Sequence, residues 1–182
     1  MILHHSVYGW FDTQSEQVCA EMVMKYPNGS LFVEIGAFMG KSTCYIAQEI
    51  KRKNKEIEFH VIDHFCGSPE HEQMLKGKNL FDIFINNMEA AEVLDSIEVI
   101  RKDANDVIEN YEDNSIDFLY LDADHSYEAV KNDIQKWLPK VRGTLVGDDY
   151  VNVHPGVIKA VNEILGQENI RIHGRTWIYE VK

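Results

Sequence analysis

Only three cysteines occur in the sequence, and no two of them are spaced as a C-x-x-C pair. An odd number without that spacing excludes a disulfide scaffold and gives no support to a structural zinc site. No apolar stretch reaches membrane-spanning length, and the first residues lack the charged and then apolar pattern of a signal peptide. Cys19, Cys44 and Cys66 are typical of a reducing compartment, so we expect a soluble cytoplasmic protein without membrane association.

Basic residues are scarce relative to acidic ones. Eighteen lysines and arginines stand against 30 aspartates and glutamates, which gives a net charge of −12 at pH 7. The one notable basic cluster, at 51–55, ends an expected helix, where positive charge complements the helix dipole. No basic run offsets repulsion from phosphates, so neither nucleic acid nor an anionic membrane surface is expected as a partner.

The segment 36–42 comes close to two common phosphate-binding motifs but matches neither of them. The motif G-x-x-x-x-G-K-[ST] needs two glycines five residues apart, but Gly36 and Gly40 are four apart. The dinucleotide motif G-x-G-x-x-G fails because Phe38 stands where its second glycine is required. We therefore expect this turn to bind a ligand that has no pyrophosphate.

The residues that are present there predict an apolar strand at 31–35, a sharp turn and a helix. Gly36 can adopt the positive φ of such a turn and lets a ligand lie against bare backbone. The helix that begins near Gly40 directs free N–H groups and a positive dipole end at the crevice, which Glu34 faces with a negative charge. Both signs of charge suit a zwitterion such as the amino-acid part of S-adenosylmethionine. The cofactor contacts expected in this turn are Glu34, Gly36, Ala37, Gly40 and Ser42.

Strands and helices alternate along most of the chain. The apolar run 116–121 predicts a central parallel strand that is buried on both faces. The last two strands, 171–172 and 176–181, are joined by three residues, which is too short for a crossover helix and predicts a hairpin. The other expected strands are 31–35, 57–62, 96–100 and 144–147, and the expected helices are 12–26, 41–53, 80–94, 104–111, 127–138 and 157–165.

This order predicts an α/β fold, a Rossmann-like three-layer sandwich whose mostly parallel sheet ends in a C-terminal antiparallel hairpin strand. We expect a single domain over residues 1–182, with an N-terminal segment and helix in 1–30 and the Rossmann-like core in 31–182. Ligands of such folds bind outside the carboxyl ends of the strands. Every expected parallel strand ends on at least one acid, which is more than chance predicts and indicates a site.

The acids after strands two and three predict contacts to a nucleoside. Asp63, followed by His64, can accept hydrogen bonds from vicinal ribose hydroxyls. Asp103 and Ala104 can present a carboxylate and a backbone N–H to an adenine edge. The alternative is that Asp63 and Asp103 cap a turn or a helix, and for Asp103 the two roles do not exclude each other.

Three aspartates at the ends of adjacent strands predict a cation site. Asp122, Asp148 and Asp149 would repel one another unless a cation neutralised them, and oxygen ligands favour Mg²⁺ or a similar hard ion. The alternative is that Asp124 or Asp149 caps a helix and that the other acids are solvated. His125 lies three residues past Asp122 and can accept a proton near neutral pH.

These segments together resemble a known family. VEIGAFMGKS at 33–42, the acid at 63, and the D-x-D-H and D-D residues at 122–125 and 148–149 are similar to class I S-adenosylmethionine-dependent methyltransferases. The similarity is to the metal-dependent O-methyltransferases of the catechol, caffeoyl-coenzyme A and macrolide-sugar type. IDHFCGSPEH at 62–71 also resembles small proteins grouped with cephalosporin-biosynthesis methyltransferases. The resemblance spans about 31–181.

The resemblance implies roles for individual residues. It puts the methionine moiety at Glu34, Gly36 and Ser42, the ribose at Asp63, and the adenine at Asp103 with Ala104. It puts a divalent cation, Mg²⁺ by preference, at Asp122, Asp148 and Asp149, and Asp122 is also counted among the cofactor contacts. His125 stands where catechol enzymes have a catalytic lysine and some sugar enzymes a histidine, and Asp124 matches a residue proposed as a base. We favour His125 over Asp124 as the base, and the missing lysine argues against a catechol.

The leading prediction is metal-assisted O-methylation of a hydroxyl on a small molecule, with the acceptor lined by 8–11 and by the irregular segment 65–79. The alternative is a cofactor- or nucleotide-binding protein of the same fold without methyl transfer, and a metal-dependent hydroxylase or hydrolase comes third. The sequence names neither the acceptor nor the oligomeric state, and it leaves a homo-oligomer open.

Overall fold

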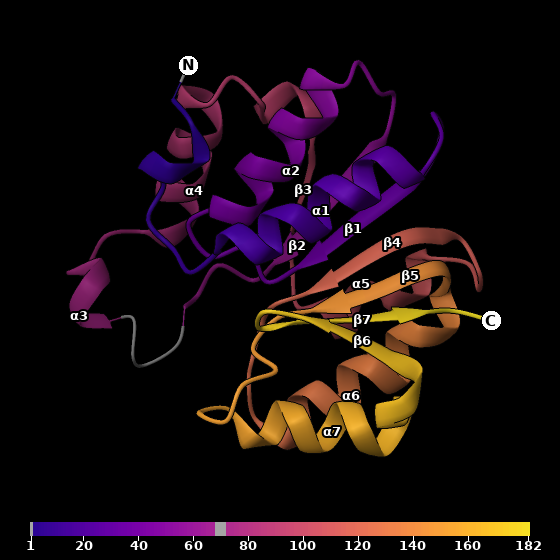
Figure 1. Cartoon of the computed structure of the whole chain (residues 1–182). Coiled ribbons are helices and arrows are strands. Elements are labelled where there is room, and N and C mark those ends of the chain that lie inside the picture. Colours follow the sequence, from indigo (N-terminus) through magenta and orange to yellow (C-terminus); the bar gives the residue numbers. More distant parts are fainter. Residues whose placement is uncertain (1, 68–71) are drawn as a thin grey trace.

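The computed structural model describes residues 2–67 and 72–182, whose strands form one seven-stranded sheet. The strand order is β3-β2-β1-β4-β5-β7-β6, and the neighbours from β3 to β5 are parallel (Figure 1). β7 runs antiparallel to both β5 and β6, which confirms the predicted hairpin and the Rossmann-like fold class. The strands are β1 (Leu31–Ile35), β2 (Glu58–Asp63), β3 (Glu98–Arg101), β4 (Ile116–Leu121), β5 (Val141–Gly147), β6 (Ile170–His173) and β7 (Thr176–Glu180).

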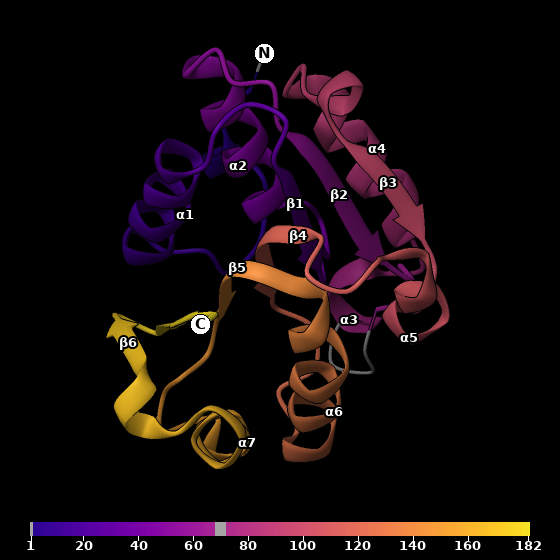
Figure 2. The ribbon, with the colours of Figure 1, turned by 90° about the vertical axis from the view of Figure 1, so that its right-hand side faces the viewer.

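Helices cover both faces of this sheet, so the fold has three layers (Figures 1 and 2). One face carries α1 (Thr13–Lys25), α2 (Lys41–Arg52) and α4 (Leu80–Ala90), and the other carries α5 (Ala104–Val107), α6 (Tyr127–Trp137) and α7 (Pro155–Leu165). A short helix, α3 (Glu72–Leu75), precedes α4. Side chains of Asp12, Asn79 and Ser126 accept hydrogen bonds from the first turns of α1, α4 and α6, which fixes where these helices begin.

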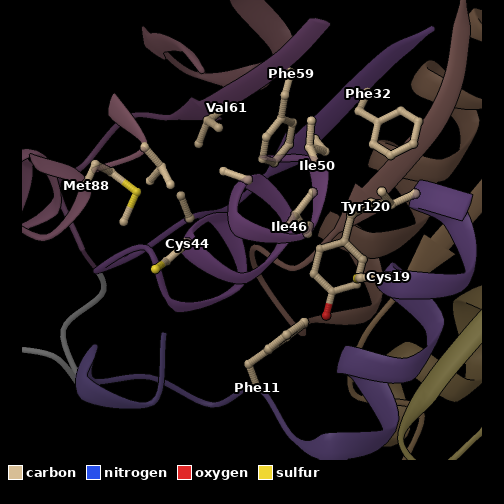
Figure 3. Packing of buried hydrophobic residues seen from close by; sticks show 14 of the residues in the cluster. Phe11, Cys19, Phe32, Cys44, Ile46, Ile50, Phe59, Val61, Met88 and Tyr120 are labelled. Atoms are coloured by element: carbon tan, nitrogen blue, oxygen red, sulfur yellow. The ribbon is translucent and has the colours of Figure 1, made fainter. Parts of the chain in front are cut away.

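The central strand β4 separates two hydrophobic cores. Its six residues are all buried, as the sequence predicts, and they alternate between the faces. Phe118 and Tyr120 pack with Phe32 and Phe59 against α1, α2 and α4, as Figure 3 shows in part. Leu119 and Leu121 instead pack against α6 and α7, together with buried Trp137 and Trp177. Both faces of the sheet are therefore covered by buried hydrophobic side chains.

The predicted boundaries differ from the structure at a few elements. β5 begins at Val141 and not at 144, because Pro139 and Gly143 interrupt the apolar pattern without preventing the strand. α4 ends at Ala90, and short 3-10 helices at Leu94–Ser96 and Ile108–Asn110 replace the expected helical ends. The segment expected to be irregular contains α3, and residues 68–71, part of the stretch that resembles cephalosporin-type methyltransferases, lie outside the described residues.

No helix in the described part of the chain is both long and apolar enough to cross a membrane.

Candidate functional site

A cavity of about 1290 Å³ lies along the carboxyl edge of the parallel strands. Residues from the turn after β1, from the ends of β2 and β4, and from the loops after β3 and β5 line it, as expected for this fold. Of the residues predicted as site residues, the cavity lining includes Gly36, Ala37, Ser42, Asp63, His64, Asp103, Ala104, Asp122, Asp124, His125, Asp148 and Asp149. Glu34 and Gly40 do not line it.

The turn after β1 requires glycine at position 36. Gly36 has φ +89°, which confirms the positive φ expected from the sequence. A Cβ at Gly36 would lie 2.1 Å from the carbonyl oxygen of Asp122, so the loops after β1 and β4 pass too close for a side chain. Gly40 also has φ +89°, but its missing side chain leaves room for Phe84 and Met88 of α4. Gly36 therefore shapes the cavity, while Gly40 serves the packing beneath it.

Glu34 is fully buried and is not among the residues that line the cavity, so its contact with the cofactor stays a prediction. Its two carboxylate oxygens accept hydrogen bonds from the hydroxyls of Ser42 and Thr43 in the first turn of α2. Burial raises the pKa of Glu34 to about 8, although the two hydroxyl donors act in the opposite direction. The carboxyl group of Glu34 thus holds the start of α2 against β1. Of the two residues that donate these hydroxyls, Ser42 lines the cavity.

Asp63 ties the glycine turn to the end of β2. Its Oδ2 accepts hydrogen bonds from the backbone N–H groups of Ala37 and Phe38, at 2.9 and 3.0 Å, and its Oδ1 accepts from Phe65 N at 2.6 Å. This is the turn-capping role that the sequence left open as the alternative to ribose binding. Because Asp63 also lines the cavity, the ribose contact remains a prediction.

Replacing Asp63 with alanine should weaken binding of S-adenosylhomocysteine by about 1.5–3 kcal/mol, the value of hydrogen bonds to a charged group. The Asp63→Asn variant keeps one oxygen for Ala37 and Phe38 and serves as the matched control. Calorimetric titration measures both variants. If both bind like the wild type, Asp63 contributes nothing to the cofactor site.

The loop after β3 and the face of α6 form another part of the cavity. Asp103 accepts a hydrogen bond from Asn105 N at 2.8 Å and caps α5, which lowers the pKa of Asp103. Asn132 and Asp133 of α6 also line this region, and neither was predicted from the sequence. Burial raises the pKa of Asp133 to about 6. Their position on the cavity side of α6 could not be read from the polar pattern alone, because surface helices carry such residues routinely.

The acids after β5 are neutralised in part by the chain itself. Arg175, in the turn between β6 and β7, places its Nε 3.2 Å from Asp148 Oδ2 and its Nη2 against Asp149 Oδ1. Burial, with a further contribution from Asp122, raises the pKa of Asp148. Asp148 Oδ1 is buried and has no hydrogen-bond partner among the described residues. The acids alone predicted a neutralising cation here, but no pattern in the sequence identified Arg175.

His125 lies between two of the acids. Its Nε2 is 2.8 Å from Asp149 Oδ2 and 3.6 Å from Asp122 Oδ1, and Asp122 raises the pKa of the imidazole. Asp124 also lines the cavity, and its carboxylate accepts a hydrogen bond from Ser126 N at 2.6 Å, which lowers the pKa of Asp124. Asp124 therefore stabilises the turn before α6, whereas the cap of that helix is Ser126 and not Asp124.

Three groups of histidines and acids among the described residues could hold a metal ion, and one of these groups lines the cavity. His125, Asp149 and His154 bring one donor atom each within 4.8 Å of one another. Asp122, Asp148 and Asp149 do not form such a group in the part of the chain that the structure describes. Arg175 lies against Asp148 and against one oxygen of Asp149. His154, which lies just before α7, had no motif in the sequence to single it out.

The comparisons with known proteins agree with this geometry. A family described as a methyltransferase domain matches residues 33–150, from β1 to the loop after β5. A protein of Acanthamoeba polyphaga mimivirus is 33% identical over 138 residues, which cover 74% of this chain and 58% of the viral protein. A second relative, from Sinorhizobium fredii, is 26% identical over 60% of this chain and 12% of its own length. The chain thus spans less than two thirds of these relatives.

Solved structures share the fold at low sequence identity. An O-methyltransferase from Bacillus cereus, in complex with SAH, has a TM-score of 0.67 and 19% identity, over 96% of this chain and 83% of the other. The O-methyltransferase NovP has a TM-score of 0.64 and 19% identity, over 92% of this chain and 79% of the other. The sheet order, the glycine turn after β1 and the matched family together lead to one conclusion: the chain belongs to the methyltransferase domain family.

Proposed function

We propose that this protein transfers a methyl group from S-adenosylmethionine to a hydroxyl of a small molecule. The observation that carries the proposal is a continuous cavity that joins two kinds of surface. The turn at Gly36, Asp63 and Asp103 line it with groups suited to a zwitterion and a nucleoside, and His125 and the acids after β4 and β5 line it with groups suited to a reacting hydroxyl. The SAH complex of the Bacillus cereus neighbour supports the choice of cofactor.

The chain's own residues would bind and orient the cofactor. S-adenosylmethionine supplies a methyl group that is already activated by its sulfonium. Bare backbone at Gly36 and Ala37 and the hydroxyl of Ser42 would contact the methionine moiety, with Asp63 and His64 at the ribose. Asp103 and Ala104 would contact the adenine. Catalysis by such a site depends mainly on alignment of the acceptor oxygen with the methyl group.

The acceptor would enter beside an aromatic segment near the N-terminus. Tyr8 and Trp10 line the cavity although they are 54% and 53% exposed. The Trp10 and Phe38 rings lie 5.8 Å apart, and Lys41 Nζ donates a hydrogen bond to Gly9 O at 2.9 Å, which holds the segment to α2. Exposed rings at a cavity mouth suit a planar or ring-shaped acceptor. Phe11, predicted as part of this lining, is instead 5% exposed and packs in the core.

A divalent cation at the acids would supply Lewis acidity to the acceptor hydroxyl. The three aspartates predicted from the sequence, Asp122, Asp148 and Asp149, are one candidate ligand set at this edge of the cavity. Asp148 Oδ1 is buried without a hydrogen-bond partner among the described residues, although Arg175 lies against the other oxygen of Asp148. His125 and Asp124 are the candidate proton acceptors. Asp149 adopts φ +61°, a conformation that aspartate and asparagine tolerate better than most residues.

Transfer of a radiolabelled methyl group from S-adenosylmethionine to a panel of catechols, sugars and other hydroxylated molecules tests the proposal. We expect label on a hydroxyl of at least one acceptor class, and loss of transfer when a strong chelator is added. Transfer that survives the chelator contradicts the role of the cation. Cofactor binding without transfer to any acceptor favours a cofactor-binding protein of the same fold.

We propose a cytoplasmic protein, in keeping with three free cysteines, two of them buried. We propose a small-molecule acceptor as the partner and no nucleic acid, in keeping with the net charge of −12.

A further inference from the structure

Two imidazoles and one carboxylate meet at the acceptor side of the cavity. Asp149 Oδ2 is 2.8 Å from His125 Nε2 and 3.8 Å from His154 Nε2, and the two imidazole rings lie 4.7 Å apart. All three side chains line the cavity. Asp149 is nearly inaccessible, with 5% of its side chain exposed. One carboxylate oxygen and two imidazole nitrogens that lie within 4.8 Å of one another could hold a metal ion.

The position of Arg175 favours a ligand set that includes imidazole nitrogens over a set of three aspartates. Its guanidinium faces Asp148 Oδ2 and Asp149 Oδ1, so these oxygens already have a positive partner. Asp149 Oδ2, the other oxygen of the same carboxylate, is left to the two histidines. An ion bound by the three aspartates would have to displace the guanidinium, whereas an ion bound by His125, Asp149 and His154 would not.

We propose that His125, Asp149 and His154 together bind a borderline transition-metal ion, of the Zn²⁺, Co²⁺ or Fe²⁺ class, in preference to Mg²⁺. Imidazole nitrogen suits these ions, while Mg²⁺ prefers oxygen ligands alone. Three protein ligands leave coordination positions open, as catalytic metal sites require. The inference rests on the proposed function only for the use of the ion, because binding itself needs no acceptor.

This ligand set also bears on the proton acceptor. An imidazole nitrogen that ligates an ion cannot accept a proton at the same time. If His125 ligates the ion, Asp124 is the other predicted proton acceptor that lines the cavity.

Calorimetric titration with Co²⁺, Zn²⁺ and Mg²⁺, with the visible absorption of bound Co²⁺ as a second readout, tests the proposal on the full chain. We expect one site that binds Co²⁺ and Zn²⁺ and that prefers them to Mg²⁺ by at least about 10-fold, as expected from the donor set. His154→Ala should lower Co²⁺ affinity by about 10–100-fold, in the range of substitutions that disturb a metal site.

Two oxygen-ligand variants distinguish this site from the three-aspartate alternative. Asp148→Asn should change Co²⁺ affinity by less than about 3-fold, far below the loss of a ligand, and Asp122→Asn repeats the comparison if the first variant fails to fold. His5→Ala and Glu98→Gln are matched controls, because they disrupt the two other groups of histidines and acids among the described residues. Both should leave the Co²⁺ site intact.

The reverse pattern overturns the inference: Mg²⁺ bound as tightly as Co²⁺, with affinity lost in Asp148→Asn or Asp122→Asn and kept in His154→Ala. Titration of S-adenosylhomocysteine into the same samples separates the two claims. Normal binding of S-adenosylhomocysteine together with that reverse pattern rejects the ligand set but not the proposed methyl transfer. If the wild-type protein does not bind S-adenosylhomocysteine, the proposed function is rejected.

Discussion

Gly36→Ala should bind S-adenosylhomocysteine about 10²-fold more weakly than the wild type, in line with the cost of misplacing a site by about 1 Å. A Cβ at this position would lie 2.1 Å from Asp122 O and 2.7 Å from Ala123 Cα, so the loops after β1 and β4 must move apart. Both loops line the cavity. The left-handed conformation adds about 1 kcal/mol or more of strain for any residue with a side chain.

Gly29→Ala is the matched control, since Gly29 has φ +80° but a Cβ added there would meet no atom within 4 Å. It carries the same backbone strain without the clash. We expect a modest loss of thermal stability and unchanged cofactor affinity. Equal affinity in Gly36→Ala and Gly29→Ala would show that the turn after β1 does not form the cofactor site.

His125→Ala should lower the rate of methyl transfer by about 10²–10⁴-fold and leave cofactor affinity nearly unchanged. His125 Nε2 lies within 3.6 Å of carboxylate oxygens from both Asp122 and Asp149, on the acceptor side of the cavity. It is therefore placed to take the acceptor proton or to bind an ion that acidifies the hydroxyl. Steady-state rates on an identified acceptor, with calorimetry of S-adenosylhomocysteine, measure the two quantities separately.

Asp124→Asn tests the other candidate base, and His173→Ala is the control for His125→Ala. Asparagine keeps an oxygen that can accept the hydrogen bond from Ser126 N, so a fall in rate reports on proton transfer and not on the loop. His173 is a histidine of the β6–β7 hairpin that contacts Gln17, and its loss should have no effect. Normal rates in both His125→Ala and Asp124→Asn would mean that the protein supplies no base.

The main elements of the fold could be predicted because burial leaves a direct pattern in the sequence. The runs at Leu31–Ile35 and Ile116–Leu121 are strands with the predicted bounds, since parallel strands covered on both faces are continuously apolar. β5 is longer than predicted because Arg142 and Gly143 interrupt the apolar pattern after Val141 without ending the strand.

The candidate site could be located from the sequence, but its internal contacts could not. Acids after each parallel strand meet at one edge in any fold of this class, so Asp122 and Asp148 could be placed near one another. The inward position of Glu34 depends on hydroxyls from α2, which no strand pattern shows. These are tertiary contacts between elements, and the spacing of residues within one element does not reveal them.

The position of Arg175 also depends on a contact between elements that the sequence does not show. The hairpin that contains it was predicted, but its pairing partner was not. β7 pairs antiparallel with β5, with Trp177 opposite Gly147, so the turn before β7 must lie beside the carboxyl end of β5. Once that pairing is known, a guanidinium next to Asp148 and Asp149 follows from topology, and the charge balance of the site changes with it.

Calorimetric titration of the purified protein with S-adenosylhomocysteine, compared with NAD under the same conditions, tests the central claim most directly. The cavity joins a bare glycine turn to acids after β2 and β3, and the sequence of that turn has no motif for a pyrophosphate. We therefore predict saturable one-to-one binding of S-adenosylhomocysteine and no comparable binding of NAD. Binding of NAD, with none of S-adenosylhomocysteine, would contradict the account.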